Sequence, residues 1–317
     1  MDVASKSLEA RIGQQGAAGS FANDAQGIAA LGDFCRAHQA DLVAMEATGG
    51  YEQQAFAQLS EQGVAVAILN PRAVRQFAQS MGWLEKTDRI DAGMIAWYAE
   101  VKGAQPVCLG PENQQHLRAL VTRLRQLTDV RSAQFNQQRL VTDRKVQASF
   151  KKLLALLSRQ IGELEQSIAA LLARDPLWRQ FDQAFRSIKG VADRTVARLM
   201  AEMPEIGRLS NKTISKLAGV APLANDSGKR QGKRAVRGGR AAVREILFMV
   251  ASVVGRHEPD FIAFRLRLRA AGKPPKVVRI ALAHKLLVRL NAKAREVRQA
   301  MASLACDPAA VVQIESA

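Results

Sequence analysis

The stretch "DLVAMEATGGYEQQAFAQLSEQGVAVAILNP" (residues 41–71) contains two short apolar segments separated by an amphipathic one. The apolar segments, 41–48 and 64–71, include β-branched residues and end in Gly-Gly and Asn-Pro, which is typical of buried strands. The segment between them, 51–63, predicts a helix that ends at Gly63. A strand, a helix and a strand in succession indicate an α/β sheet with helix-covered faces.

The flanking segments extend this alternation over residues 1–100. "SLEARIG" (7–13) alternates in polarity like a strand, and "AQGIAALGDFCRAH" (25–38) has apolar residues at helical spacing. "RAVRQFAQSMG" (72–82) predicts a further helix. We therefore expect an α/β domain in the N-terminal third of the chain.

The pattern changes near residue 110, where leucine and isoleucine recur at alternating intervals of three and four. The positions of these two seams are Leu117, Leu120, Leu124, Leu127, Leu154, Leu157, Ile161, Leu164, Ile168 and Leu171. Such heptad seams predict two long helices, either as an antiparallel pair or as an oligomerisation stalk. "RDPLW" (174–178) ends the second helix, and residues 180–317 are expected to form a mostly helical second domain.

The charge composition indicates the class of partner. The 317 residues include 46 Lys and Arg against 29 Asp and Glu, which gives a formal net charge of +17. This excess favours a polyanionic partner, and nucleic acid is the first candidate. A membrane is the second, but the longest apolar run, 246–255, is too short to span a bilayer. Cys35, Cys108 and Cys306 lack metal-like spacing and indicate a reducing cytosol.

Four acidic residues form the first candidate site. Asp2 precedes an expected strand hairpin, Glu46 lies at the end of segment 41–48, and Asp88 and Asp91 open a predicted helix. Carboxylates at strand ends and on a neighbouring helix can converge at one edge of an α/β sheet. Clustered carboxylates repel one another unless cations are bound, and Mg²⁺ favours oxygen ligands. Two such ions can stabilise the attacking and leaving oxygens of a phosphodiester.

These acidic residues also have a structural interpretation. Asp88 can cap the helix, with Asp91 in the favourable first turn, and for this pair alone the capping interpretation is preferred. Glu46 is harder to explain in this way, because an acid inside an apolar strand needs partners. The residues by themselves leave both interpretations open.

The second candidate site is "NDSGKRQGKRAVRGGR" (225–240), a segment dense in glycine and cations. Ser227 lies within it, and cations or metals can activate a serine hydroxyl for attack on a phosphodiester. The alternative is an Asp-Ser-Gly turn in a solvated loop, which the residues alone favour for Ser227. The predicted nucleic-acid-binding residues are Lys229, Arg230, Lys233, Arg234, Arg237, Arg240 and Arg244.

Two further segments carry weaker signals for phosphate binding. "AFRLRLRAAGKPPK" (263–276) is either a strand with one basic face or a helix end with basic residues before a Pro-Pro stop. "SIKGVADRTVARLMAEM" (187–203) resembles the second half of a helix-hairpin-helix, a unit that presents backbone amides to phosphates.

Several segments, in this order, resemble one family. They are "MDVASK" (1–6), "MEATGGYE" (45–52), "NPRAVRQFAQSMGWLEKTDRIDAGMIA" (70–96), "SIKGVADRTVARLMAE" (187–202) and the basic segment 216–251. Over nearly the whole chain, the sequence resembles insertion-sequence transposases of the IS-one-ten group, which also includes the Piv-type DNA invertases.

The resemblance implies an N-terminal RuvC-like (RNase H-fold) domain with a DEDD tetrad for Mg²⁺, to which Asp2, Glu46, Asp88 and Asp91 correspond. It also implies coiled-coil helices and a mainly α C-terminal domain, whose nucleophilic serine corresponds to Ser227. Insertion-sequence members are understood as bridge-RNA-guided recombinases that bind donor and target DNA and act as homo-oligomers. The resemblance therefore implies a guide RNA and a dimer or a tetramer for this chain. The implied location is the bacterial cytoplasm, in association with the nucleoid.

On this basis we expect a metal domain over 1–108, a coiled-coil section over 109–178, a transposase domain over 179–305 and a tail over 306–317. Relatives carry several apolar residues before the first Asp, where this sequence has only Met1. A shortened first strand or an upstream start is therefore expected. Three alternatives for function stay open: a RuvC-like nuclease that uses metal-bound water, a protein-only DNA invertase, and a non-catalytic DNA- or RNA-binding scaffold.

Overall fold

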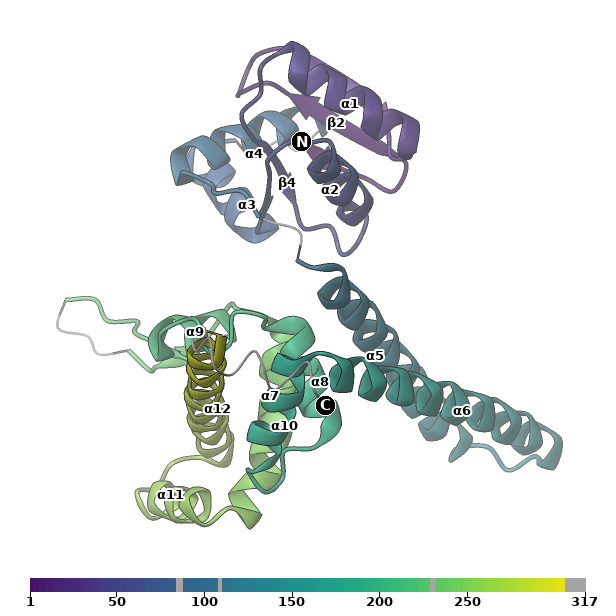
Figure 1. Cartoon of the computed structure of the whole chain (residues 1–317), viewed down its shortest axis with the longest axis vertical. Helices are drawn as coiled ribbons and strands as arrows, with labels where there is room; N and C mark the ends of the chain where they lie inside the picture. The colour runs from purple at the N-terminus through teal and green to yellow at the C-terminus, as the bar shows by residue number, and fades with distance from the viewer. Residues whose placement is uncertain (84–87, 108–109, 229–231, 306–317) are drawn as a thin grey trace. The chain divides into compact units, whose positions relative to one another are not determined.

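The computed structural model describes residues 1–83, 88–107, 110–228 and 232–305. The chain divides into two compact units, Met1–Gly110 and Pro111–Ala317, and each is described by itself (Figure 1). The predicted domain bounds stay a prediction, and the predicted tail, 306–317, lies outside the described residues. Within the described ranges, no helix is both long and apolar enough to cross a membrane.

The first unit is a mixed α/β structure with five short strands among its described residues. Their bounds are β1 (Asp2–Val3), β2 (Ser7–Arg11), β3 (Ala18–Ala22), β4 (Val43–Glu46) and β5 (Val66–Leu69). One antiparallel sheet has the order β1-β2-β3, and β4 and β5 form a parallel pair. The two sheets meet at β1 and β4, where the Met1 ammonium donates a hydrogen bond to the Ala44 carbonyl oxygen over 2.8 Å.

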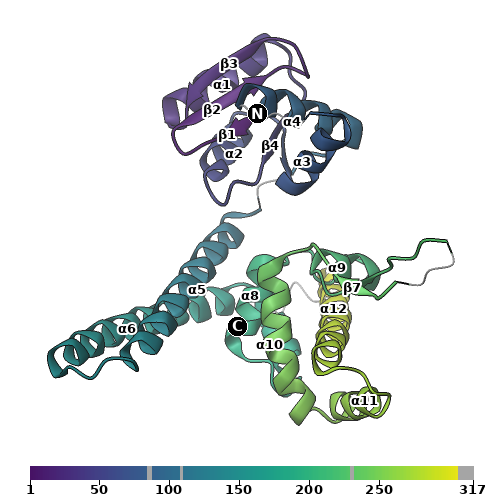
Figure 2. The ribbon, with the colours of Figure 1, turned by 180° about the vertical axis from the view of Figure 1, so that it is seen from behind.

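Helices cover both faces of these strands (Figure 2). They are α1 (Ala25–Ala37), α2 (Glu52–Glu61), α3 (Pro71–Ser80) and α4 (Asp88–Lys102). Val43 and Met45 pack in one core with residues of α1 and α2, whereas Ala44 packs in another core with residues of α3 and α4. Successive strand residues point to opposite faces, so the two helix pairs lie on opposite sides. The predicted α/β arrangement with helix-covered faces is confirmed.

The second unit begins with a helical hairpin formed by α5 (Glu112–Gln138) and α6 (Arg144–Arg174). The two helices lie side by side along their length (Figure 1), and Leu124 and Ile161 are buried in a common core. Asp143 caps α6 by accepting a hydrogen bond from the amide of Val146 over 2.9 Å. Of the two predicted arrangements, the structure therefore shows the antiparallel pair.

The rest of the second unit is mainly helical. Its described elements are α7 (Pro176–Arg186), α8 (Asp193–Glu202), α9 (Asn211–Leu217), β6 (Pro222–Leu223), β7 (Ala235–Val236), α10 (Ala241–His257), α11 (Pro259–Ala270) and α12 (Pro275–Ala305). One hydrophobic core joins the hairpin helices to these helices. Segment 263–276, left open between strand and helix, is the end of α11 and the turn into α12. Phe261, Phe264 and Leu268 pack at helical spacing against the core, which selects the helix.

Candidate active site

Asp2 and Glu46 lie on the same face of neighbouring strands. Met1 and Val3, on either side of Asp2, belong to the core that includes α1 and α2, so strand alternation places Asp2 on the opposite face. Glu46 follows Met45 of the same core and therefore also lies on that opposite face. Both carboxylates are half-buried and act electrostatically on the Met1 ammonium, which joins the two strands.

Helix α4 packs on this face and carries the other two predicted ligands. It contacts both β1 and β4, and its residues Ile95 and Ala99 are buried there. Asp91 is half-buried and lies one helical turn before Ile95. Asp88 is the first residue of α4, three positions earlier. The three elements that bear the four predicted carboxylates therefore meet in one unit.

The arrangement stops short of a complete metal centre. Among the described side chains, no three His, Cys, Asp or Glu are grouped closely enough to hold one ion. The side chain of Asp88 lies outside the described part of the chain. The donors are all carboxylate oxygens, which suits a hard divalent cation, so the residue types fit the implied metal. The four-carboxylate site stays a prediction.

Glu52 organises the loop after β4, and the sequence analysis missed it. Its carboxylate accepts hydrogen bonds from the Thr48 amide at 3.1 Å, the Thr48 hydroxyl at 2.7 Å and the Gly50 amide at 2.8 Å. Burial by itself would raise the pKa of Glu52, but these hydrogen bonds outweigh it and hold the pKa below its usual value. Glu52 thus fixes the turn that begins just beyond Glu46. The available signal was an acidic first helical residue after a Thr-Gly-Gly turn.

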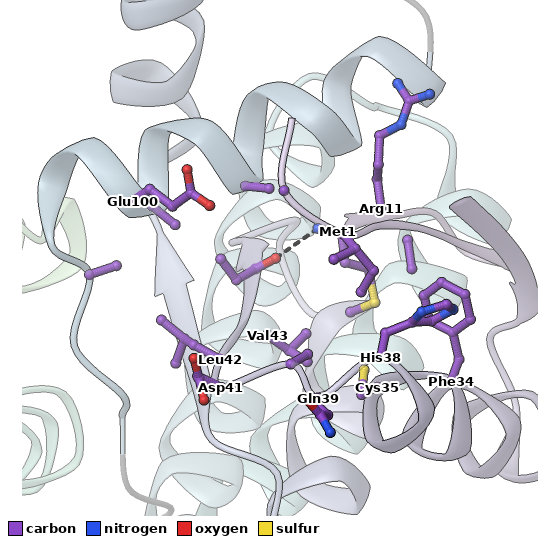
Figure 3. Close-up of a pocket in the computed structure, with 18 of the residues that line it drawn as sticks. Met1, Arg11, Phe34, Cys35, His38, Gln39, Asp41, Leu42, Val43 and Glu100 are labelled. Carbon is purple, nitrogen blue, oxygen red and sulfur yellow. Dashed lines mark hydrogen bonds between the residues drawn. The ribbon is translucent and has the colours of Figure 1, made fainter. Parts of the chain in front are cut away.

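A cavity of about 420 Å³ lies beside β1, between β2 and β4 (Figure 3). Burial lowers the pKa of the Met1 ammonium in its wall to about 6, and burial also raises the pKa of the Cys35 thiol. Neither Asp2, Glu46 nor Asp91 lines this cavity. We therefore assign no part of the chemistry to it.

Ser227 lies in an exposed loop between β6 and β7, a strand pair that was not predicted. Asp226 closes this loop. One of its carboxylate oxygens accepts a hydrogen bond from the Gly232 amide at 3.1 Å, and the other accepts one from the Arg234 guanidinium at 2.7 Å. Ser227 is therefore exposed on a loop whose two sides are tied together.

The base of the hairpin formed by β6 and β7, which carries Ser227, is fixed to the end of α9. The Arg240 amide donates a hydrogen bond to the Leu217 carbonyl oxygen at 2.8 Å. A Cβ atom on Gly239 would lie 2.3 Å from the Gly219 nitrogen, so only glycine permits this approach of two backbones. The Arg240 guanidinium binds both carboxylate oxygens of Glu205, at 2.7 and 2.5 Å. Burial alone would raise the pKa of Glu205, but Arg240 brings it below its usual value.

The predicted nucleic-acid-binding residues differ in whether they contact other parts of the chain. Arg234 and Arg240 form the ion pairs described above, and Arg244 donates a hydrogen bond to a backbone carbonyl at 2.5 Å. Arg234 and Arg240 thus also hold the loop, and their predicted role in binding nucleic acid stays a prediction. Lys233 and Arg237 are exposed and form no ion pair with another described residue. The predicted residues outside the described part are Lys229 and Arg230.

The turn between α7 and α8 was expected to present amides to phosphate, but it packs against α10. The Lys189 amide donates a hydrogen bond to the Glu258 carboxylate at 3.3 Å. Gly190 has φ of +102°, and a Cβ atom there would lie 3.0 Å from the side chain of Val253. We therefore treat this turn as part of the packing between helices.

Two transposase family models match the chain. One, described as "Transposase" and built on the DEDD domain of IS110 elements, matches residues 1–146. The other, described as "Transposase IS116/IS110/IS902 family", matches residues 182–265. The chain belongs to the IS110 family of transposases. The first match covers β1, β4 and α4, which bear the four predicted carboxylates, and the second covers the loop that carries Ser227. The predicted family is confirmed.

The transposase is also similar to the pilin gene-inverting proteins of Moraxella lacunata and Moraxella bovis. Each is 26% identical to it over 285 residues, and the match covers 84% of this chain and 85% of the relative. Family membership makes the IS110 transposase a DNA-binding enzyme that recombines DNA, and the DEDD domain implies a divalent metal.

Proposed function

We propose that this IS110 transposase cuts and rejoins DNA through a covalent bond between the Ser227 oxygen and a DNA phosphate. The observation that carries the proposal is the loop geometry, in which Ser227 is exposed and Asp226 ties the two sides of its loop together. A nucleophile held in a fixed loop loses less entropy when it meets its target. Lys233 and Arg237 lie exposed on the same hairpin and can bind flanking phosphates.

The proposed step is an exchange of phosphate esters. The Ser227 oxygen forms a bond to phosphorus and its proton passes to solvent, while the bond from phosphorus to a deoxyribose oxygen breaks. That oxygen takes up a proton and leaves as a free DNA hydroxyl. The phosphate remains esterified to the serine, so attack by a DNA hydroxyl re-forms a phosphodiester and releases Ser227 without another energy source.

The second part of the proposal assigns Mg²⁺ to the acidic face under α4. Asp2 and Glu46 face α4, and Asp91 with Asp88 begins that helix. A bound divalent cation would supply stabilisation of negative charge on the reacting phosphate. The antiparallel β1-β2-β3 sheet beside the parallel β4-β5 pair supports a RuvC-like, RNase H-type domain.

A homo-oligomer, a dimer or a tetramer, completes the proposal. The acidic face and the serine loop belong to different compact units, so the acidic face of one copy can act with the serine loop of another. Large apolar side chains exposed on the helical hairpin support self-association, because such surfaces are typical of interfaces. They are Val130, Phe135, Leu140, Val146, Leu153 and Leu156.

Guidance by a bridge RNA belongs to the same proposal. A net charge of +17 suits a protein that holds a second polyanion beside its DNA. The competing function is protein-only inversion, which the similarity to pilin gene-inverting proteins favours. Strand exchange with and without the element's own RNA separates them, because a protein-only invertase gains nothing from added RNA.

Strand exchange by variants tests the two sites. We expect Ser227→Ala to lower the rate by at least about 10³-fold, the loss typical of a missing nucleophile. Glu46→Ala should cause a similar loss, whereas Ser132→Ala, at an exposed serine on α5, should leave the rate unchanged. Undiminished exchange by Ser227→Ala or by Glu46→Ala would contradict the role given to that residue.

A further inference from the structure

The turn between α11 and α12 concentrates positive charge away from the serine loop. Residues 261–295 contain ten Lys and Arg and neither Asp nor Glu. Five of these cations are exposed around the turn, and we call them the basic corner. They are Arg267, Arg269, Lys273, Lys276 and Arg279.

The neighbouring acids do not neutralise this corner. Glu258 and Asp260, just before and at the start of α11, both bind Arg289, each over 3.3 Å. Lys285 donates a hydrogen bond to the Asp260 carbonyl oxygen at 3.0 Å. Arg289 and Lys285 are thus engaged, whereas the cations of the basic corner form no ion pair with any described residue. Their charge is available to an external anion.

The corner is held on a rigid support. Phe261 is fully buried and anchors α11 in the core. The Arg267 guanidinium lies 5.2 Å from the centre of the Phe264 ring, and that of Arg279 lies 4.9 Å from the Phe248 ring. Cation–π contacts restrict these side chains yet leave their charge exposed. Binding therefore costs less ordering than it would for free side chains.

Helix α12 fixes the separation between the basic corner and the support of the serine loop. Its first turn lies at α11 and a later turn lies beside α9 (Figures 1 and 2). There Asn291 is buried and donates hydrogen bonds to the Leu209 carbonyl oxygen and to Asn211 of α9. From Lys276 to Asn291 the helix rises about 22 Å, at about 1.5 Å per residue. This is about two thirds of a turn of B-form DNA.

We infer that the basic corner binds the phosphate backbone of duplex DNA that flanks the strand cut at Ser227. The inference rests on the proposed function for the choice of DNA as the polyanion. The corner offers cations without base-reading groups, so it supplies affinity and orientation and leaves the chemistry to Ser227.

A salt titration of DNA binding tests this role in the full-length chain. The variant Arg269→Gln, Lys273→Gln, Lys276→Gln removes three exposed charges that form no ion pair with a described residue. Its matched control is Arg144→Gln, Lys151→Gln, Lys152→Gln, three exposed cations on α6. The probe is a plain duplex of about 20 base pairs, followed by fluorescence anisotropy against salt concentration.

We expect the corner variant to weaken duplex DNA binding at least about tenfold and to reduce the salt slope by about 0.9 for each lost phosphate contact. An unchanged slope, or an equal loss in the α6 control, would overturn the inference. Loss of affinity for duplex RNA but not for duplex DNA would overturn it as well. At saturating protein the corner variant should still form the proposed adduct, in which the Ser227 oxygen is bonded to a DNA phosphate. An adduct missing from the parent protein would instead count against the proposed function.

Discussion

Arg234 donates a hydrogen bond to the carboxylate of Asp226 over 2.7 Å, between the two sides of the loop that carries Ser227. Asp226 also accepts the Gly232 amide with its other oxygen. The pair therefore turns a glycine-rich, strongly basic segment into a closed loop. It also gives Arg234 a structural role, which was not predicted, beside its predicted role in phosphate binding.

The first prediction concerns the clamp that Asp226 forms with Arg234 and Gly232 across the serine loop. Asp226→Asn keeps the size of the side chain but removes the charge that holds Arg234, so the serine should be less well positioned. We expect the rate of strand exchange at saturating DNA to fall by about 10- to 100-fold, the cost of a small misplacement. Arg237→Ala removes a cation from the same hairpin without touching the clamp, and should weaken binding while sparing that rate. A parental rate in Asp226→Asn would refute the positioning role.

The second prediction concerns the base of the serine hairpin. Arg240→Ala leaves Glu205 without the partner that binds both of its oxygens. Because both side chains are about one third exposed, with 35% and 33% of their surface accessible, solvent screens the pair. We expect a loss of about 1–2 kcal/mol in urea unfolding of the second unit. Adding Glu205→Ala should recover part of this loss, and strictly additive losses would argue against a direct coupling.

The third prediction is a pH dependence of stability. The pKa of Glu52 is lowered by its hydrogen bonds to Thr48 and Gly50, so folding favours its charged form. Its contribution is therefore complete above the ordinary value of 4.5 and is lost as the pH falls through the lower folded value. Glu52→Gln should be less stable than the parent at neutral pH and should lose less stability below pH 4.5. Parallel unfolding curves of the two proteins against pH would contradict this assignment.

The fourth prediction concerns metal binding without reference to activity. Glu46→Gln removes one carboxylate from the face under α4, so a divalent cation should bind at least about tenfold more weakly. Titration calorimetry with Mg²⁺ or Mn²⁺ measures this directly. Glu61→Gln, at an exposed acid at the end of α2, is the matched control and should bind like the parent. Equal affinity in all three proteins would remove Glu46 from the metal site.

The parts of the fold that were predictable are those with local patterns. The sequence of segment 41–71 predicted β4, α2 and β5. Continuous apolar runs indicate strands that are buried on both faces, and Gly63 indicates the end of the helix, so each signal lies in neighbouring residues. Segment 263–276 remained open, since alternating Arg and Leu fits two periods. Only the packing of Phe261, Phe264 and Leu268 selects the helix.

The missed parts depend on contacts between distant positions. β6 and β7 have two residues each, and their hairpin relies on the close approach of Gly219 and Gly239. The ion pair of Arg240 was not predicted, because its partner Glu205 lies 35 positions away. The acidic site is an intermediate case, because strand alternation predicts the faces of Asp2 and Glu46 only after the order of the strands is known.

The most direct test of the account is the chemical identity of the bond between protein and DNA. The parent protein is incubated with donor DNA, target DNA, the element's RNA and Mg²⁺, denatured, digested, and analysed by mass spectrometry. We predict a nucleotide attached through phosphate to the peptide that contains Ser227, and no such peptide from Ser227→Ala. DNA cut and rejoined without any adduct, or with the adduct on another residue, would contradict the central role of Ser227.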